Sequence, residues 1–230
     1  MRLVNEIVKG NYADIFNIEG FFQLENIRVP EYQRPYRWKP KTVTQLIEDI
    51  RTFNNKPNYR FGSIVIHCNQ IEEDFTKKIY LDIVDGQQRY TTIRLLIHAL
   101  YDLTNNNVKY SQSTQKLLNG LNIKLQKVEI KYSNKQEAEN IYNNYLLLKR
   151  SIQNFDDKII QNFIKKFEVV VFFIHDETEA FQFFDSQNSR GKDLYPHDLL
   201  KAFHLRELGK EEVAVQSEIV ENWRHMIVKG

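Results

Sequence analysis

Residues 83–92 read Ile-Val-Asp-Gly-Gln-Gln-Arg-Tyr-Thr-Thr and join the end of a predicted strand to the start of a predicted helix through a glycine turn. The preceding residues, 78–84, are rich in β-branched and apolar side chains, which is typical of a strand. Downstream, apolar residues recur at helical spacing at Ile93, Leu96, Ile97 and Leu100. The first amides of such a helix are unpaired and point toward one spot, where the helix dipole adds positive potential. The stretch therefore predicts a phosphate site at Gly86.

Polar side chains in this stretch strengthen the prediction. Arg89 adds a forked cation to the first helical turn, and Gln87 and Gln88 add amides that can reach phosphate or base edges. An Asp-Gly turn followed by a surface helix is the alternative, and it explains Asp85 and Gly86. It does not explain two glutamines and an arginine together.

Two carboxylates near the turn are candidate metal ligands. Asp82 and Asp85 are three residues apart and face opposite ways on an ideal strand, so they can act together only if the chain already turns at Val84. We expect Asp82 to be structural. Asp85 is the candidate for a contact with Mg²⁺ or water, because Mg²⁺ usually relies on one or two carboxylates and on substrate phosphates.

A second candidate segment, residues 29–41, reads Val-Pro-Glu-Tyr-Gln-Arg-Pro-Tyr-Arg-Trp-Lys-Pro-Lys. Cations interleaved with aromatic rings can hold phosphate by charge and stack on bases. The alternative is a proline-stiffened loop whose aromatic side chains fill the core, and for Tyr36 and Trp38 we favour it. Gln33 and Arg34 remain candidates for a ligand.

A third candidate segment, residues 184–194, reads Phe-Asp-Ser-Gln-Asn-Ser-Arg-Gly-Lys-Asp-Leu. Asn188 and Gly191 suit a turn at the end of a helix, where Gly191 would supply a positive φ. This leaves the polar side chains of Asn188, Arg190 and Lys192 available to a ligand.

Composition bounds the class of protein. The chain has 230 residues, with 32 Lys and Arg against 30 Asp and Glu, which describes a soluble globular protein. The longest apolar run, 169–174, is far shorter than the roughly 18 residues of a membrane span. The single cysteine, Cys68, indicates a reducing compartment, and we expect it to be inert and the protein to be cytoplasmic.

Periodicity predicts the remaining elements. A helix capped by Thr42 or Thr44 carries the apolar stripe Val43, Leu46, Ile47 and Ile50. Strands are expected at 61–67, 78–84 and 167–175. A polar loop joins the first two, and the third is expected to be buried on both faces. Further helices are expected at 134–152, from 159 onward, and at 177–184, 196–208 and 211–228. Residues 108–131 are ambiguous: a short helix at 115–118 is followed by 121–130, which could be a strand.

Several segments together resemble the N-terminal domain of GmrSD-type modification-dependent restriction systems. They are residues 29–38, the Phe-Gly-Ser-Ile-Val-Ile of 61–66, the Val-Asp-Gly-Gln-Gln-Arg of 84–89, the Phe-x-x-x-Asn-x-x-Gly of 184–191, and the Asp-Leu-Leu-Lys of 198–201. The resemblance implies an α/β (α+β) fold, with a ParB/sulfiredoxin-like small sheet core and a helical extension. Residues 1–107 would form the core with the nucleotide motif, and 108–230 a mainly helical part whose strand near 167–175 returns to complete the core.

The same resemblance implies that the domain binds and hydrolyses a nucleoside triphosphate with Mg²⁺, coupled to recognition of modified, often phage, DNA. By position, the nucleotide would contact Gly86, Gln87, Gln88 and Arg89, with Gln33 and Arg34 as a second wall of the pocket and Asn188 and Gly191 as a third. We expect catalytic roles for Asp85, Gln88 and Arg89: Arg89 on phosphate oxygens, Asp85 or Gln88 orienting water, and Asp85 on the metal.

Family members commonly carry a C-terminal His-Asn-His-type nuclease domain, and this chain has no matching histidine cluster near its end. We therefore expect no DNA cleavage by this chain alone and a nuclease domain or subunit as a partner. A ParB-like nuclease core is disfavoured because no dense acidic cluster is visible. The alternative function is a non-catalytic nucleic-acid-binding or adaptor module, in which Arg34, Arg37, Lys39 and Lys41 contact the phosphate backbone.

Overall fold

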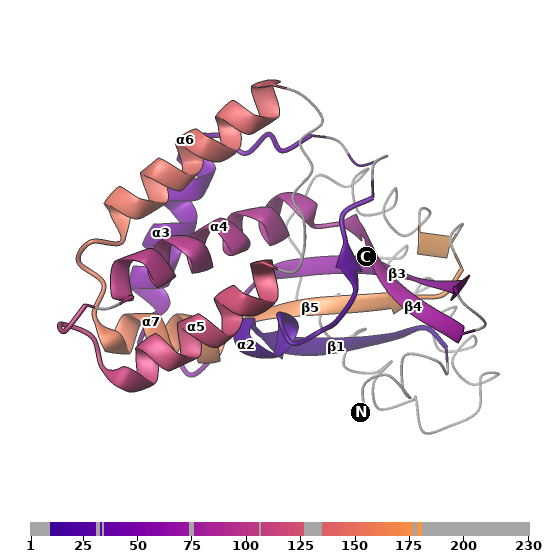
Figure 1. The fold of residues 1–230 in the computed structure, drawn as a ribbon, viewed down its shortest axis with the longest axis horizontal. Helices are drawn as coiled ribbons and strands as arrows, with labels where there is room; N and C mark the ends of the chain where they lie inside the picture. Colours follow the sequence, from indigo (N-terminus) through magenta and orange to yellow (C-terminus); the bar gives the residue numbers. More distant parts are fainter. Residues whose placement is uncertain are drawn as a thin grey trace, which may run out of the picture.

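The computed structural model describes residues 10–30, 33, 35–73, 76–105, 107–126, 135–176 and 179–180. In these residues a five-stranded mixed sheet is combined with six helices, most of them gathered on one side of the sheet (Figure 1). The predicted α/β class is confirmed. Its finer assignment as ParB/sulfiredoxin-like stays a prediction.

The sheet contains β1 (Tyr12–Asn17), β2 (Ile27–Arg28), β3 (Tyr59–Glu73), β4 (Thr76–Asp85) and β5 (Phe167–Ile174). Their order is β1-β5-β3-β4-β2. Strand β3 pairs antiparallel with β4 and parallel with β5, while β1 is antiparallel to β5 and β2 is parallel to β4. The strand predicted at 167–175 thus forms as β5 and lies between β1 and β3, where both of its faces are covered.

The helices are α2 (Ile18–Phe21), α3 (Pro40–Phe53), α4 (Gln87–Thr104), α5 (Gln112–Gln126), α6 (Lys135–Ser151) and α7 (Asp157–Lys166). The apolar stripes predicted for α3 and α4 are buried. Helix α3 begins earlier than expected, at Pro40 with Lys39 as N-cap, and neither Thr42 nor Thr44 caps it. Proline suits the first helical position, because the amide there has no partner within the helix and the proline ring already fixes a helical φ. None of the described helices combines the length and hydrophobicity needed to cross a membrane.

One ambiguity is resolved and one expectation is corrected. Residues 121–126 belong to helix α5 and not to a strand, because Leu118, Leu121 and Leu125 lie on one helical face and are buried there, against α4. The β3–β4 pairing continues to Glu73 and Thr76, beyond the expected ends of both strands. The polar residues expected to form a loop instead continue both strands, because strand pairing depends on backbone hydrogen bonds and not on apolar side chains.

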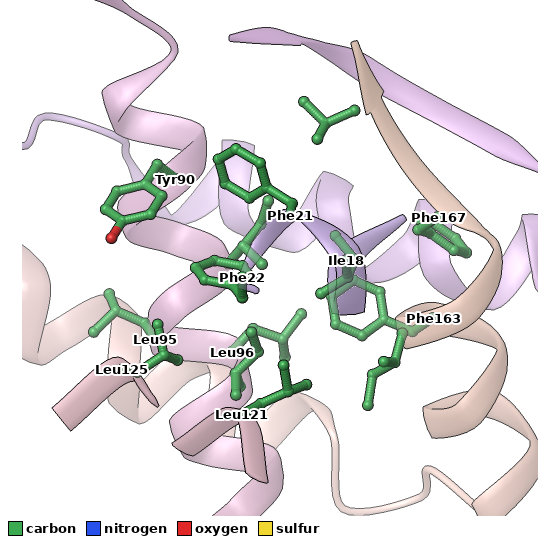
Figure 2. Close-up of a cluster of buried hydrophobic side chains, with 14 of the residues drawn as sticks. Ile18, Phe21, Phe22, Tyr90, Leu95, Leu96, Leu121, Leu125, Phe163 and Phe167 are labelled. Carbon is green, nitrogen blue, oxygen red and sulfur yellow. The ribbon is translucent and has the colours of Figure 1, made fainter. Parts of the chain in front are cut away.

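The main core lies between the helices and one face of the sheet. Figure 2 shows α2 at its centre, with Ile18, Phe21 and Phe22 between residues of α4 on one side and Phe163 and Phe167 on the other. A smaller cluster on the opposite face contains Ala13, Val65, Val84, Val170, Phe172, Ile174 and Ala180. The helices predicted at 196–208 and 211–228 lie outside the described residues, as does most of the one predicted at 177–184.

Removing a ring from this core tests its contribution to stability. Phe163 is 1% exposed and its ring centroid lies 5.6 Å from that of Phe167. We expect Phe163→Ala to lower the free energy of unfolding by about 3–5 kcal/mol, because it leaves a cavity. The matched control is Tyr142→Ala on α6, where the ring is 61% exposed and the expected change is within about 0.5 kcal/mol. Equal losses in urea denaturation of the two variants would contradict this description of the core.

Candidate functional site

The predicted succession of strand, glycine turn and helix is formed at Gly86. Strand β4 ends at Asp85, Gly86 is the N-cap of α4 with φ +89°, and the amide of Tyr90 donates to the Gly86 carbonyl over 2.9 Å. A Cβ at Gly86 would lie 2.8 Å from Ile64 Cγ1 and 3.0 Å from the carbonyl oxygen of Ser63. Glycine is therefore required both by its backbone conformation and by its contact with β3. It also has no side chain with which to cap the first amides of α4.

Strand β4 contains one extra residue just before this turn. Across the hairpin Ile66 pairs with Ile83, whereas the neighbouring Val65 pairs with Asp85. Val84 is therefore a β-bulge, which bends the strand and changes the direction of the side chains that follow it.

The bulge decides how the two carboxylates face. Asp82 pairs with His67 and Asp85 pairs with Val65. His67 and Val65 are two residues apart on β3 and so share a face of the sheet. Asp82 and Asp85 consequently lie on the same face, although on an ideal strand they would point in opposite directions.

Asp82 is nevertheless committed to other partners. Its carboxylate accepts from Arg28 Nε and Nη2 at 2.6 and 2.7 Å, and from Asn69 Nδ2 at 3.0 Å. This agrees with the structural role expected for Asp82. Asp85 is half-buried at the strand end, and no hydrogen bond or ion pair joins its carboxylate to another residue of the described ranges.

Arg89 reaches back from α4 onto the edge of β3. Its Nη1 donates to the carbonyl of Ser63 over 2.5 Å. The guanidinium lies over Gly62, where a Cβ would meet Nη2 at 2.6 Å and Cζ at 2.7 Å. The register between β3 and β5 shifts between Arg60 and Ser63, and Gly62 has φ +128°. Gly62 thus makes the space that Arg89 occupies.

The sequence reasoning assigned no role to Gly62. The sequence did contain a signal for such a role, because a glycine inside a strand pattern often marks a β-bulge or a place where another group contacts the backbone closely. Only the structure identifies the group that approaches it.

Gln33 joins the same site from the second candidate segment. Its Nε2 donates to the carbonyl of Val84 over 2.8 Å, which places the amide at the bulge beside Gly86. The structure therefore brings Gln33 together with the stretch from Asp85 to Arg89. The predicted site residues Arg34, Asn188 and Gly191 lie outside the described residues.

The side chain of Gln88 is 6% exposed and is engaged with the segment that follows Gln33. Its Oε1 accepts from the amides of Arg37 at 2.7 Å and Trp38 at 3.2 Å, and its Nε2 donates to the carbonyl of Pro35 at 3.1 Å. We interpret Gln88 as a residue that holds this segment against α4. The neighbouring Gln87 is also buried.

The aromatic residues of the segment pack into the protein. Tyr36 is buried, and its hydroxyl lies 2.8 Å from Thr92 Oγ1 and accepts from Asn144 Nδ2 at 3.1 Å. Burial raises the pKa of Tyr36. Trp38 packs against the core while partly exposed. The preferred interpretation of both side chains as core residues agrees with this placement, whereas Arg37, Lys39 and Lys41 are exposed.

Cys68 lies on β3, facing the main core. Burial, with the negative charge of Asp82 as a smaller cause, raises the pKa of the Cys68 thiol to about 12. The thiol is therefore protonated near neutral pH, in agreement with the expected inertness.

The family model described as "GmrSD restriction endonuclease, N-terminal domain" matches residues 18–205, which is most of the chain. The matched range includes all three candidate segments, so the resemblance stated from the motifs is confirmed. No curated protein matches the sequence significantly.

The contact between Gly62 and Arg89 is testable with a double-mutant cycle. We expect Gly62→Ala to lower the free energy of unfolding more in the wild-type background than in Arg89→Ala, by about 1 kcal/mol, because truncating Arg89 removes the clash. The remaining cost reflects the positive φ. Chemical denaturation of the four proteins measures the coupling.

The control is Gly120→Ala in α5, where a Cβ would meet nothing within 4 Å. This change should stabilise the protein by up to about 1 kcal/mol, since alanine favours a helix more than glycine does. Additive effects of the Gly62 and Arg89 changes would contradict the assigned contact.

Proposed function

Because the chain belongs to the family of GmrSD restriction endonuclease N-terminal domains, and is thus a module of a restriction system, we propose that it binds and hydrolyses a nucleoside triphosphate at the Gly86 turn. The observation that carries the proposal is the meeting of the α4 N-terminus, Arg89 and Gln33 at one bulged strand end. In this proposal, hydrolysis is coupled to recognition of modified DNA.

The electrostatics of the α4 N-terminus favour an anion. Helix α4 spans 18 residues and has no acidic residue in its first turn. The dipole, equivalent to roughly half an elementary positive charge at this end, is therefore not compensated from within the helix. The nearest carboxylate along the chain is that of Asp85, just before the N-cap, to which the metal ion is assigned below. Phosphate oxygens near Gly86 would receive backbone amide hydrogen bonds as well as this potential.

Arg89 supplies the formal positive charge. The bond from Nη1 to the Ser63 carbonyl and the contact with Gly62 orient the guanidinium before any ligand arrives. A preorganised cation stabilises charge on transferring phosphate oxygens without reorganising during the reaction. This is the main requirement of phosphoryl transfer, which depends on positioning and charge neutralisation.

Mg²⁺ would accompany the triphosphate, and Asp85 is the residue that would hold it. No group of three or more His, Cys, Asp or Glu side chains that could bind a metal occurs in the described part of the chain. A single carboxylate at the site fits Mg²⁺, which usually takes most of its ligands from substrate phosphates and water. When bound, the ion would neutralise charge on the phosphate oxygens.

Of the two residues predicted to orient the attacking water, we favour Asp85. The Gln88 oxygen already accepts hydrogen bonds from two backbone amides. The Asp85 carboxylate is half-buried and is engaged with no other described residue. Asp85 would accept a hydrogen bond from the water and align it with the terminal phosphate.

Substitution of Arg89 tests the nucleotide site. We expect Arg89→Ala to weaken binding of a nucleoside triphosphate with Mg²⁺ by about tenfold or more, because a hydrogen bond to a charged group contributes about 1.5–3 kcal/mol. Isothermal titration calorimetry with each of the four ribonucleoside triphosphates measures the affinity. The matched control is Arg60→Ala, an exposed arginine of β3 paired with Glu168. A wild-type chain without binding, or equal affinities of both variants, would refute the site.

A second candidate function is nucleic-acid binding, favoured by the exposure of Arg37, Lys39 and Lys41. None of the three forms an ion pair with another residue that the structure describes. Each is thus available to a phosphate of the DNA backbone.

Replacing these three cations by alanine should weaken DNA binding at low salt. It should also reduce the slope of the logarithm of the binding constant against the logarithm of salt concentration by about three, roughly one per lost phosphate contact. Gel shifts over a salt series, with and without triphosphate, provide the measurement. Alanine at the exposed cations Lys116, Arg150 and Lys158 is the control. Identical slopes in both triple variants would exclude this surface.

A further inference from the structure

One face of α6 carries three polar side chains that all bind the segment 36–38. Glu137 Oε1 accepts from the amide of Tyr36 at 2.8 Å, and Asn140 Nδ2 donates to the Tyr36 carbonyl at 3.2 Å. Asn144 Nδ2 donates to the carbonyl of Trp38 at 2.7 Å. Residues spaced by three and four lie on one side of a helix. We call Glu137, Asn140 and Asn144 the α6 polar stripe.

Helix α4 holds the same segment from the other side. Gln88 binds the backbone of Pro35, Arg37 and Trp38, and Thr92 Oγ1 lies 2.8 Å from the Tyr36 hydroxyl. The segment itself is neither helix nor strand. Buried backbone groups need partners, and here side chains of two helices provide them where a neighbouring strand would otherwise do so.

The stripe satisfies backbone groups of the segment with an imperfect match of its own polar atoms. Asn144 is 1% exposed, and its buried Oδ1 has no hydrogen-bond partner in the part of the chain that the structure describes. Burying an unsatisfied carbonyl is unfavourable, so the hydrogen bonds that Asn144 donates to the Tyr36 hydroxyl and the Trp38 carbonyl must offset that cost. Elsewhere on α6, Ile141 and Leu148 pack into the core in the ordinary way.

We propose that the α6 polar stripe is a positioning element of the site at Gly86, an inference that rests on the proposed nucleotide-binding function. Gln33, which donates to the Val84 carbonyl, is three residues from Tyr36. A chain of that length spans at most about 10 Å, so anchoring Tyr36 restricts where Gln33 can lie. The stripe thereby keeps the Gln33 amide beside the Gly86 turn without touching the ligand itself.

Asn144→Leu tests the positioning role in a chain that still folds. The variant places an apolar group of similar size in the buried position and removes the donor to the Trp38 carbonyl and the Tyr36 hydroxyl. Because buried acceptors lose their donor, we expect the thermal unfolding midpoint to fall while the chain still folds. Backbone amide exchange in peptides covering 35–38 should accelerate by about tenfold more than in peptides covering β5, as the loss of one anchoring hydrogen bond implies. The affinity for triphosphate with Mg²⁺ should fall by about the same factor.

The matched control is Asn143→Leu, on the exposed face of the same helix, which should change neither quantity. If Asn144→Leu fails to fold, Asn140→Ala provides the second variant, because Asn140 is only half-buried and donates to the Tyr36 carbonyl. Its effects should have the same direction and be smaller.

The two readouts distinguish the possible failures. Unchanged amide exchange in both Asn144→Leu and Asn140→Ala would overturn the claim that the stripe holds the segment. Faster exchange with unchanged nucleotide affinity would overturn the positioning role. A wild-type chain that binds no triphosphate would overturn the proposed function and the positioning role together. Amide exchange needs no ligand, so it decides separately whether the stripe holds the segment.

Discussion

The close contact of Gly86 with the backbone of Ser63 and Ile64 is the constraint on which the site depends. Because no side chain intervenes, the first turn of α4 lies directly against β3. That proximity brings the Arg89 guanidinium to the Ser63 carbonyl and over Gly62. Any Cβ at Gly86 would separate helix from strand and move Arg89 with it.

The irregularities of the sheet gather around this contact. Val84 is an extra residue in β4, and the β3–β5 register shifts near Gly62. Bulges are common beside functional sites, because they redirect side chains that would otherwise alternate between the two faces of the sheet. Here they turn Asp85 onto the face of Asp82 and leave the Val84 carbonyl accessible to Gln33. A regular hairpin would offer neither arrangement.

Polar residues around the turn divide into those that hold the structure and those that face a ligand in the proposed function. Asp82 is bound by Arg28 and Asn69, and Gln88 binds the backbone of segment 35–38. Asp85 has no such partner in the described ranges, and Arg89 is oriented by its contact with β3. The distinction matters for mutagenesis. If substituting Gln88 lowered the activity, the cause would be displacement of segment 35–38 and not the loss of a catalytic group.

Local pattern in the sequence determined the buried stripes of α3 and α4, the strand β5 and the glycine turn at Gly86, because each depends on neighbours within about one or two turns. The motifs also identified the family, since they occur together in a fixed order. The same local reasoning left the helix at 121–126 unresolved, because its loose alternation also suits a strand. Only the tertiary structure decided that Gln88 and Asn144 hold segment 35–38 and that Gly62 accommodates Arg89. Those contacts join residues 26 to 108 positions apart, and periodicity along the chain carries no information about them.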